Sequence, residues 1–194
     1  MKRFILGVDL DGVCADYQLG LHTFATQMGY NLPENPYPAT WDLSSAGWFK
    51  DKEEFERVHQ RAVASGMFVA LKEMEGVSDA LWQLNELEVH IRIVTHRLIG
   101  HGNHDVAVSD TVRWLQFPSL DGKPRIPFRD IAFLGSKEAL DSDLHIDDAP
   151  HVIKAMKGAG HNVIIFDAPY NRDIDGQRAR NWSEIVEIVK ERLA

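Results

Sequence analysis

The sequence is poor in cysteine, has no long apolar run and carries no excess of basic residues. Its one cysteine, Cys14, excludes an intramolecular disulfide and favours a cytoplasmic location. No apolar run approaches the roughly 20 residues that a membrane-spanning helix needs, so we expect no membrane segment. With 21 Lys and Arg against 29 Asp and Glu, the net charge is −8, which disfavours a long nucleic acid as partner. A small phosphate ester stays open, because it requires only local positive charge or a metal ion.

The 194 residues are 44% hydrophobic, enough for one domain with a substantial core and an inserted lobe. Short apolar segments rich in β-branched residues predict five strands, at residues 4–8, 90–94, 131–134, 144–146 and 163–166. Between and after these segments, apolar residues recur at helical spacing, which predicts helices at residues 77–84, 108–115, 152–156 and 185–193. This alternation predicts an α/β, Rossmann-like parallel sheet with helices on both faces. In such sheets a ligand binds beyond the carboxyl ends of the strands.

Residues 17–72 interrupt the alternation, being rich in proline and aromatic side chains. Phe55, Val58 and Ala62 share one helical face there. We interpret the segment as a small, mainly helical cap inserted after the first strand, with residues 1–16 and 73–194 forming the core domain. A cap above the strand ends could exclude water and select the substrate.

The first predicted strand ends in Asp9-Leu10-Asp11-Gly12. Side chains alternate along a strand, so both carboxylates lie on one face and repel each other unless a cation separates them. Mg²⁺, which prefers oxygen ligands, suits this position. An aspartate held there can also act as a nucleophile. Because Asp-Gly is by itself a common turn signal, the other strand ends must decide.

Polar groups follow three more predicted strands: Thr95, then Lys137, then the pair Asp147-Asp148. The set matches the needs of phosphoryl transfer, with Asp9 attacking phosphorus and Asp11 as general acid and then base. Thr95 and Lys137 would hold the phosphoryl oxygens. Asp147 and Asp148 would complete a Mg²⁺ site with Asp9 and the Asp11 carbonyl.

The order of these groups resembles the haloacid dehalogenase superfamily of phosphatases. Within it, VDLDGVCADY, MFVALKEMEGV, IVTH, GSK, HIDDAP and PYNR resemble the 5′(3′)-deoxyribonucleotidase family, over residues 4–174. The resemblance implies a Rossmann-like core with a helical cap and Mg²⁺-dependent dephosphorylation of nucleoside monophosphates, with deoxypyrimidine nucleotides as the usual substrates. It makes Asp148 the direct metal ligand, and Asp147 its support or an alternative ligand. The pair His96-Arg97 departs from the small residues more usual in the family, and either side chain could reach a substrate phosphate.

Several residues have two interpretations. Trp41 and Phe49 are slightly favoured as stacking surfaces for a nucleobase, but they could equally form the core of the cap. Arg172 either holds a phosphate or ribose or locks its loop by an ion pair. For Cys14 and Asp16, near the first strand, structural roles are favoured. The loop that contains His96, His101 and His104 lacks a clear ligand spacing, so a transition-metal site is disfavoured there.

Two alternative functions stay open. One keeps the chemistry and changes the substrate to a sugar phosphate or another small ester. The other is a phospho-accepting signalling domain, which the order of the motifs and the length of the cap disfavour. Composition does not decide whether the chain forms a homodimer.

Overall fold

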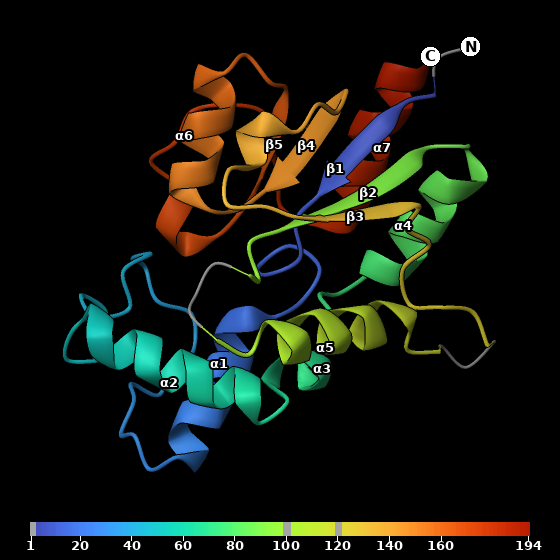
Figure 1. The fold of residues 1–194 in the computed structure, drawn as a ribbon. Coiled ribbons are helices and arrows are strands. Elements are labelled where there is room, and N and C mark those ends of the chain that lie inside the picture. Colours follow the sequence, from blue (N-terminus) through green and yellow to red (C-terminus); the bar gives the residue numbers. More distant parts are fainter. Residues whose placement is uncertain (1–2, 99–101, 119–121) are drawn as a thin grey trace.

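The computed structural model describes residues 3–98, 102–118 and 122–194. Its centre is a six-stranded parallel sheet of order β3-β2-β1-β4-β5-β6 (Figure 1). The strands are β1 (Ile5–Val8), β2 (His90–Thr95), β3 (Asp130–Phe133), β4 (Leu144–Asp147), β5 (Val163–Phe166) and β6 (Arg178–Ala179). The five predicted strands are confirmed within one residue at each end. Sequence patterns missed β6, which is only two residues long and contains one apolar side chain.

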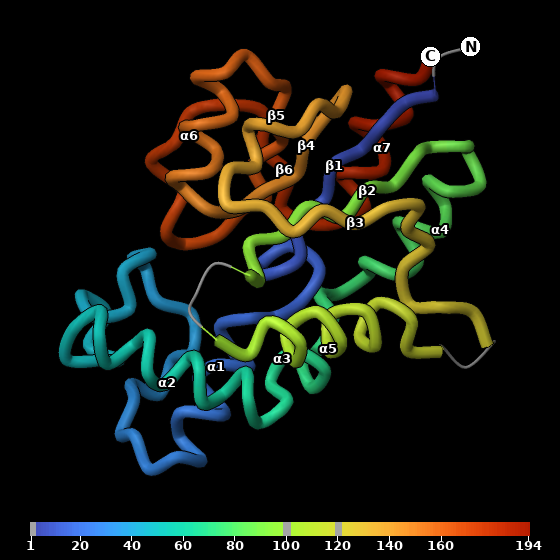
Figure 2. Tube along the Cα trace, in the orientation of Figure 1, coloured from blue at the N-terminus to red at the C-terminus, as the bar shows by residue number. Residues whose placement is uncertain are grey.

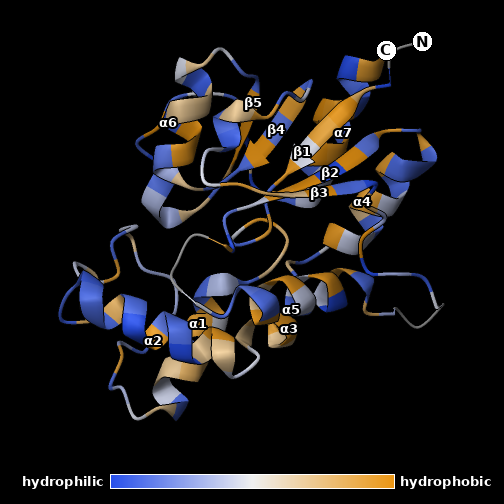
Figure 3. Cartoon of the chain, in the orientation of Figure 1, coloured by the Kyte–Doolittle hydropathy of each residue, from blue (hydrophilic) through white to orange (hydrophobic). Residues whose placement is uncertain are grey.

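The sheet is covered on both faces, as β5 illustrates. Ile164 and Phe166 belong to the main hydrophobic core, which also contains the buried face of α7 (Trp182–Leu193). Val163 and Ile165 join a second cluster with α6 (Pro150–Gly158). Since successive side chains of a strand point to opposite faces, α7 and α6 lie on opposite sides of the sheet. Such burial on both faces explains why the strands read as continuous apolar runs; β1 is mostly orange in Figure 3.

A layer of helices lies beyond the carboxyl ends of β1 and β2 (Figures 1 and 2). It contains α1 (Tyr17–Gln27), α2 (Lys52–Ala64) and α3 (Met67–Ala70), all from the proposed cap. It also contains α5 (His104–Gln116), which packs on α2 and α3 although the sequence division places it in the core. Trp114 of α5 donates from Nε1 to the Leu71 carbonyl at 2.8 Å, which fixes α5 to the end of α3. The layer therefore combines two distant segments of the chain, while α4 (Val77–Glu86) packs with α7.

Local chemistry explains where α1 begins. The Asp16 carboxylate accepts a hydrogen bond from the Leu19 amide at 3.1 Å, as an N-cap does, and another from the Tyr37 hydroxyl at 2.8 Å. The structural role expected for Asp16 is thereby confirmed. Cys14 is fully buried in the core, as expected.

Candidate active site

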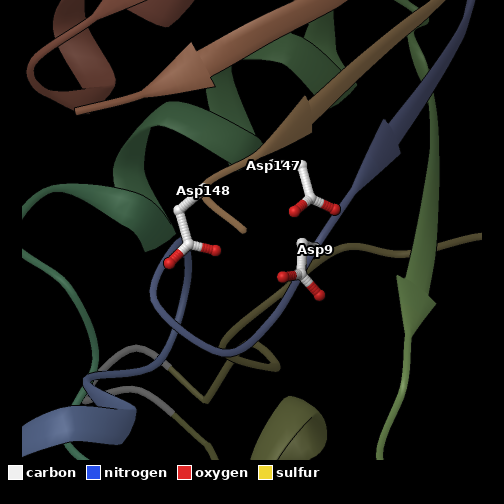
Figure 4. Close-up of side chains that lie close together, drawn as sticks. All are labelled: Asp9, Asp147 and Asp148. Carbon is white, nitrogen blue, oxygen red and sulfur yellow. The ribbon is translucent and has the colours of Figure 1, made fainter. Parts of the chain in front are cut away.

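The parallel sheet brings the predicted polar groups to one edge. Val8 in β1 pairs in register with Ile93 in β2 and Ile146 in β4, so Asp9, Thr95 and Asp147 follow at similar heights. Figure 4 shows the carboxylates of Asp9, Asp147 and Asp148 directed into one space. Oxygen atoms from the three lie within 4.8 Å of one another, and no other group of three or more metal-binding side chains this close occurs in the described ranges.

Lys137 neutralises part of this cluster. It lies in the short 3₁₀ helix η1 (Lys137–Ala139) after β3, with its side chain 3% exposed. Its Nζ is 2.7 Å from Asp9 Oδ1 and 2.8 Å from Asp147 Oδ2. Burial alone would lower the pKa of Lys137, but the carboxylates of Asp147 and Asp9 raise it above its usual value, so the ammonium stays charged.

The carboxylates nevertheless outnumber the ammonium. Burial raises the pKa of Asp9 to about 7; Lys137 opposes this rise, and Asp147 and Asp11 add to it. Burial also raises the pKa of Asp148 well above its usual value, with Asp9 and Asp147 acting in the same direction. Such shifts mark a site that lacks positive charge.

The oxygens of Asp147 and Asp148 differ in their partners. Asp147 Oδ2 accepts from Lys137, and its Oδ1 accepts from the Ala149 amide at 3.0 Å. Asp148 Oδ2 accepts from the Tyr170 hydroxyl, but its buried Oδ1 has no hydrogen-bond partner among the described residues. A buried carboxylate oxygen without a partner is costly, and a divalent cation would satisfy it. The donor set therefore fits Mg²⁺.

Asp11 faces a different partner. Its carboxylate accepts from Arg97, at 3.2 and 3.0 Å from Nε and at 2.6 Å from Nη2. Arg97 is thus held by Asp11, which differs from the expectation that it reaches a substrate phosphate. Thr95 is fully buried, and its Oγ1 accepts from the Arg97 amide at 3.4 Å.

A cavity of about 380 Å³ opens beside the carboxylates. Its lining includes Asp9, Asp11, His96, Arg97 and Lys137, together with side chains of the proposed cap. Burial and the nearby Lys137 lower the pKa of His96 to about 4, so its ring lines the cavity as neutral imidazole. The cavity brings the candidate chemistry into contact with the cap.

Only one of the two favoured cap aromatics lines the cavity. Trp41 does so, 44% exposed, with its ring 5.2 Å from that of Tyr170. Phe49 does not line the cavity: it is 4% exposed and packs against Tyr30 and Phe55, so the slightly favoured stacking role gives way to the alternative of a cap-core residue. Tyr170, in the loop after the fifth predicted strand, also lines the cavity. Sequence reasoning missed other lining residues, because no chemical motif singles them out: Tyr17, Gln18, His59, Phe68 and His151.

Arg172 does not line the cavity. Its side chain is 66% exposed and pairs with Asp167 at 3.2 Å, which matches the loop-locking alternative. Of the histidine-containing loop, His101 lies outside the described residues, and His104 begins α5.

The fold is the one found in solved hydrolases of the haloacid dehalogenase class. A haloacid dehalogenase-like hydrolase from Streptococcus pneumoniae superposes with a TM-score of 0.64 at 13% identity, covering 96% of this chain and 98% of that chain. YfnB of Bacillus subtilis, a HAD hydrolase solved bound to magnesium, superposes with a TM-score of 0.56 at 16% identity, covering 97% and 99%. At these identities the similarity establishes the fold.

Comparisons of sequence identify the family within this fold class. Residues 3–193 match the family described as 5′ nucleotidase, deoxy (pyrimidine), cytosolic type C protein. A Chlorobaculum tepidum protein named "Putative 5′(3′)-deoxyribonucleotidase" is 32% identical over 191 residues, 97% of this chain and 91% of that protein. The chain belongs to this 5′-nucleotidase family of phosphomonoesterases, and its fold is that of haloacid dehalogenase hydrolases. No helix in the described ranges is long and apolar enough to cross a membrane.

Proposed function

We propose that the protein is a Mg²⁺-dependent phosphomonoesterase for nucleoside monophosphates, of the 5′(3′)-deoxyribonucleotidase type. The observation that carries the proposal is the buried cluster of Asp9, Asp147, Asp148 and Lys137. Asp9 and Lys137 of this cluster line a cavity that is also lined by cap side chains, Trp41 among them. The family description and the name of the Chlorobaculum tepidum relative support the substrate class. A cytosolic location and a free nucleotide as partner agree with that description.

Two steps complete the proposed reaction. An Asp9 carboxylate oxygen attacks phosphorus, the ester P–O bond breaks, and the departing nucleoside oxygen takes a proton from Asp11. Asp11 enters this step as the carboxylic acid and leaves it as the carboxylate that pairs with Arg97. Water then attacks phosphorus of the aspartyl-phosphate and gives a proton to Asp11. The bond between phosphorus and the Asp9 oxygen breaks, so inorganic phosphate is released and the Asp9 carboxylate is restored. Both steps need Asp9 and Asp11 beside the bound phosphate, and the fact that both side chains line the cavity supports this.

The remaining groups hold charge and position. Lys137 lies 2.7 Å from Asp9, close enough to bind a phosphoryl oxygen there, and Thr95 offers a hydroxyl at the adjacent strand end. Asp9 and Asp148 would hold Mg²⁺ directly, with Asp147 as support and the Asp11 carbonyl as a further ligand. When bound, Mg²⁺ would neutralise the phosphoryl oxygens and lower the pKa of Asp9, which favours the ionised nucleophile.

Trp41 supports a nucleoside as the leaving group. Its partly exposed ring lines the cavity on the cap side, where a base could stack on it. A sugar phosphate would leave this apolar surface without a matching partner. Trp41 is therefore our candidate base contact, in place of Phe49.

The test is phosphate release from deoxynucleoside, nucleoside and sugar monophosphates, with Mg²⁺ and with EDTA. We expect Mg²⁺-dependent release, fastest with deoxypyrimidine monophosphates. Asp9→Asn should lose at least a thousandfold in kcat, while Asp79→Asn, at an exposed position of α4, should keep wild-type rates. Acid quenching with substrate labelled in its phosphate should trap label on wild-type protein and not on Asp9→Asn.

Two outcomes would contradict the proposal. Turnover by Asp9→Asn at the wild-type rate would exclude the aspartyl-phosphate. Release from sugar phosphates alone would keep the chemistry and exclude the nucleotide.

A further inference from the structure

Arg97 is a buried charge that the proposed reaction leaves without a role. Its side chain is fully buried, and it forms a two-point ion pair with Asp11. The planar guanidinium matches a carboxylate in this geometry better than any other cation, and it fixes the carboxylate's orientation as well as its charge. Asp11, with its side chain 25% exposed, still borders the cavity.

The guanidinium is itself held from two further sides. Nη1 donates to Thr111 Oγ1 on α5 at 3.0 Å, and that hydroxyl donates to the Ala107 carbonyl at 2.7 Å. The Phe68 ring of α3 lies 4.2 Å from the guanidinium carbon, a cation–π contact. Arg97 therefore connects the turn after β1 with two helices of the cap layer, and it has little freedom to move.

This arrangement separates Asp11 from the other carboxylates. Lys137 contacts Asp9 and Asp147, and Asp148 lies beside these two, whereas Asp11 is paired with Arg97. A general acid must lie within hydrogen-bond reach of the leaving oxygen, and a misplacement of about 1 Å can cost about a hundredfold in rate. An unrestrained aspartate would sample several side-chain rotamers, most of them directed away from that oxygen.

We propose that Arg97 is the positioning residue of Asp11: it fixes the carboxyl group where the leaving nucleoside oxygen departs. The inference rests on the proposed function, in which Asp11 is the acid. It gives Arg97 a role through Asp11 and none in holding the substrate phosphate.

The proposal predicts a dependence on the leaving group. Protonation matters for a basic leaving group such as a nucleoside alkoxide, and hardly for p-nitrophenolate, which departs unprotonated. A residue that acts through Asp11 should therefore affect the first step with a nucleotide and spare it with p-nitrophenyl phosphate. A residue that binds the phosphoryl group, or one that only stabilises the fold, should affect both substrates equally.

The experiment measures the first step in single turnover, as formation of phosphorylated protein, because Asp11 acts in the second step with both substrates. With a deoxynucleoside monophosphate, Arg97→Met should slow the step by about 10- to 100-fold, within the range of general acid catalysis. With p-nitrophenyl phosphate the change should stay within about threefold. Arg97→Lys keeps the charge and loses the two-point contact, so its first-step rate with the nucleotide should lie between those of the wild type and Arg97→Met. The control Arg180→Met removes an exposed ion pair with Glu184 and should change neither rate.

A double-mutant cycle tests whether the effect of Arg97 passes through Asp11. In an Asp11→Asn background, Arg97→Met should add no further loss with the nucleotide, because its effect passes through Asp11. If Arg97→Met fails to fold, Thr111→Val removes only an outer contact of the guanidinium, and it should show the same substrate selectivity at smaller size.

Equal losses with both substrates, or a further loss in the Asp11→Asn background, would overturn the role of Arg97. A normal first step with the nucleotide in Asp11→Asn would instead refute Asp11 as the acid, and thus the proposed mechanism. The two failures are therefore distinguishable.

Discussion

Gly12 is the position at which a single methyl group should damage the metal site most directly. The residue has φ of +87°, and a Cβ there would lie 2.1 Å from Asp148 Oδ2 and 2.7 Å from its Cγ. Asp148 has little room to retreat, because it is fully buried and bonded to the Tyr170 hydroxyl. Gly12→Ala must therefore displace either the turn or the carboxylate.

The cost has two parts. A left-handed backbone costs a residue with a Cβ about 1 to 2 kcal/mol. Loss of a hydrogen bond to a charged group costs about 1.5 to 3 kcal/mol more. Gly12→Ala should therefore destabilise the metal-free protein by about 2.5 to 5 kcal/mol. Displacement of Asp148 should also weaken Mg²⁺ binding by about 10- to 100-fold, as disturbed ligand supports do.

Gly29 provides the matched control. It follows α1 with φ of +93°, but a Cβ there would meet nothing within 4 Å. Gly29→Ala should therefore show the backbone cost alone, about 1 to 2 kcal/mol, with unchanged Mg²⁺ affinity. Urea denaturation in EDTA measures stability, and calorimetric titration measures the Mg²⁺ Kd. Equal effects of the two substitutions in both assays would refute the reasoning.

Two further predictions concern the same carboxylates. Tyr170→Phe removes the hydroxyl that donates to Asp148 and accepts from Gln18 Nε2 at 2.8 Å; calorimetry should show Mg²⁺ binding weakened about 10- to 100-fold, and an unchanged Kd would exclude Tyr170 as a support of the ligand. Because burial raises the pKa of Asp9 to about 7, the metal-free folded protein keeps a proton there that the unfolded chain has lost above about pH 4. Relative to Asp9→Asn, the wild type in EDTA should therefore lose stability as pH rises from about 4 to 7, and Mg²⁺ should restore it increasingly over that window. Thermal melts across this range check the slope, and a relative gain in stability with pH would contradict it.

The polar groups at the strand ends could be predicted because a sequence pattern and a rule of sheet topology combine. Buried parallel strands appear in the sequence as short apolar runs, and the residue after each run necessarily lies at one edge of the sheet. That is why Thr95, Lys137 and the pair of Asp147 and Asp148 could be grouped with Asp9 over more than a hundred residues of chain. The division of residues into cap and core stays a proposal, and α5 shows that packing ignores the boundary at residue 72.

The partners of individual side chains could not be predicted in the same way. Trp41 and Phe49 are both large and apolar, and only the packing of the cap decides that one lines the cavity and the other lies beneath it. Similarly, Arg97 lies two residues after Thr95, in a segment whose sequence indicates only a loop. Its partner Asp11 is 86 residues away, and Thr111 and Phe68 come from two further segments.

These partners also explain how chemically identical carboxylates can take different roles. Asp9, Asp147 and Asp148 lie together around one ammonium, which contacts Asp9 and Asp147, so their cluster keeps an excess of negative charge that a divalent cation would balance. Asp11 has a guanidinium of its own and forms a neutral pair outside that cluster. A cation placed among the first three would have less attraction to a carboxylate that is paired with Arg97, so the Asp11 side chain would stay available to take the proton of the attacking water. The assignment of roles therefore follows from where the two buried cations, Lys137 and Arg97, lie among the four acids.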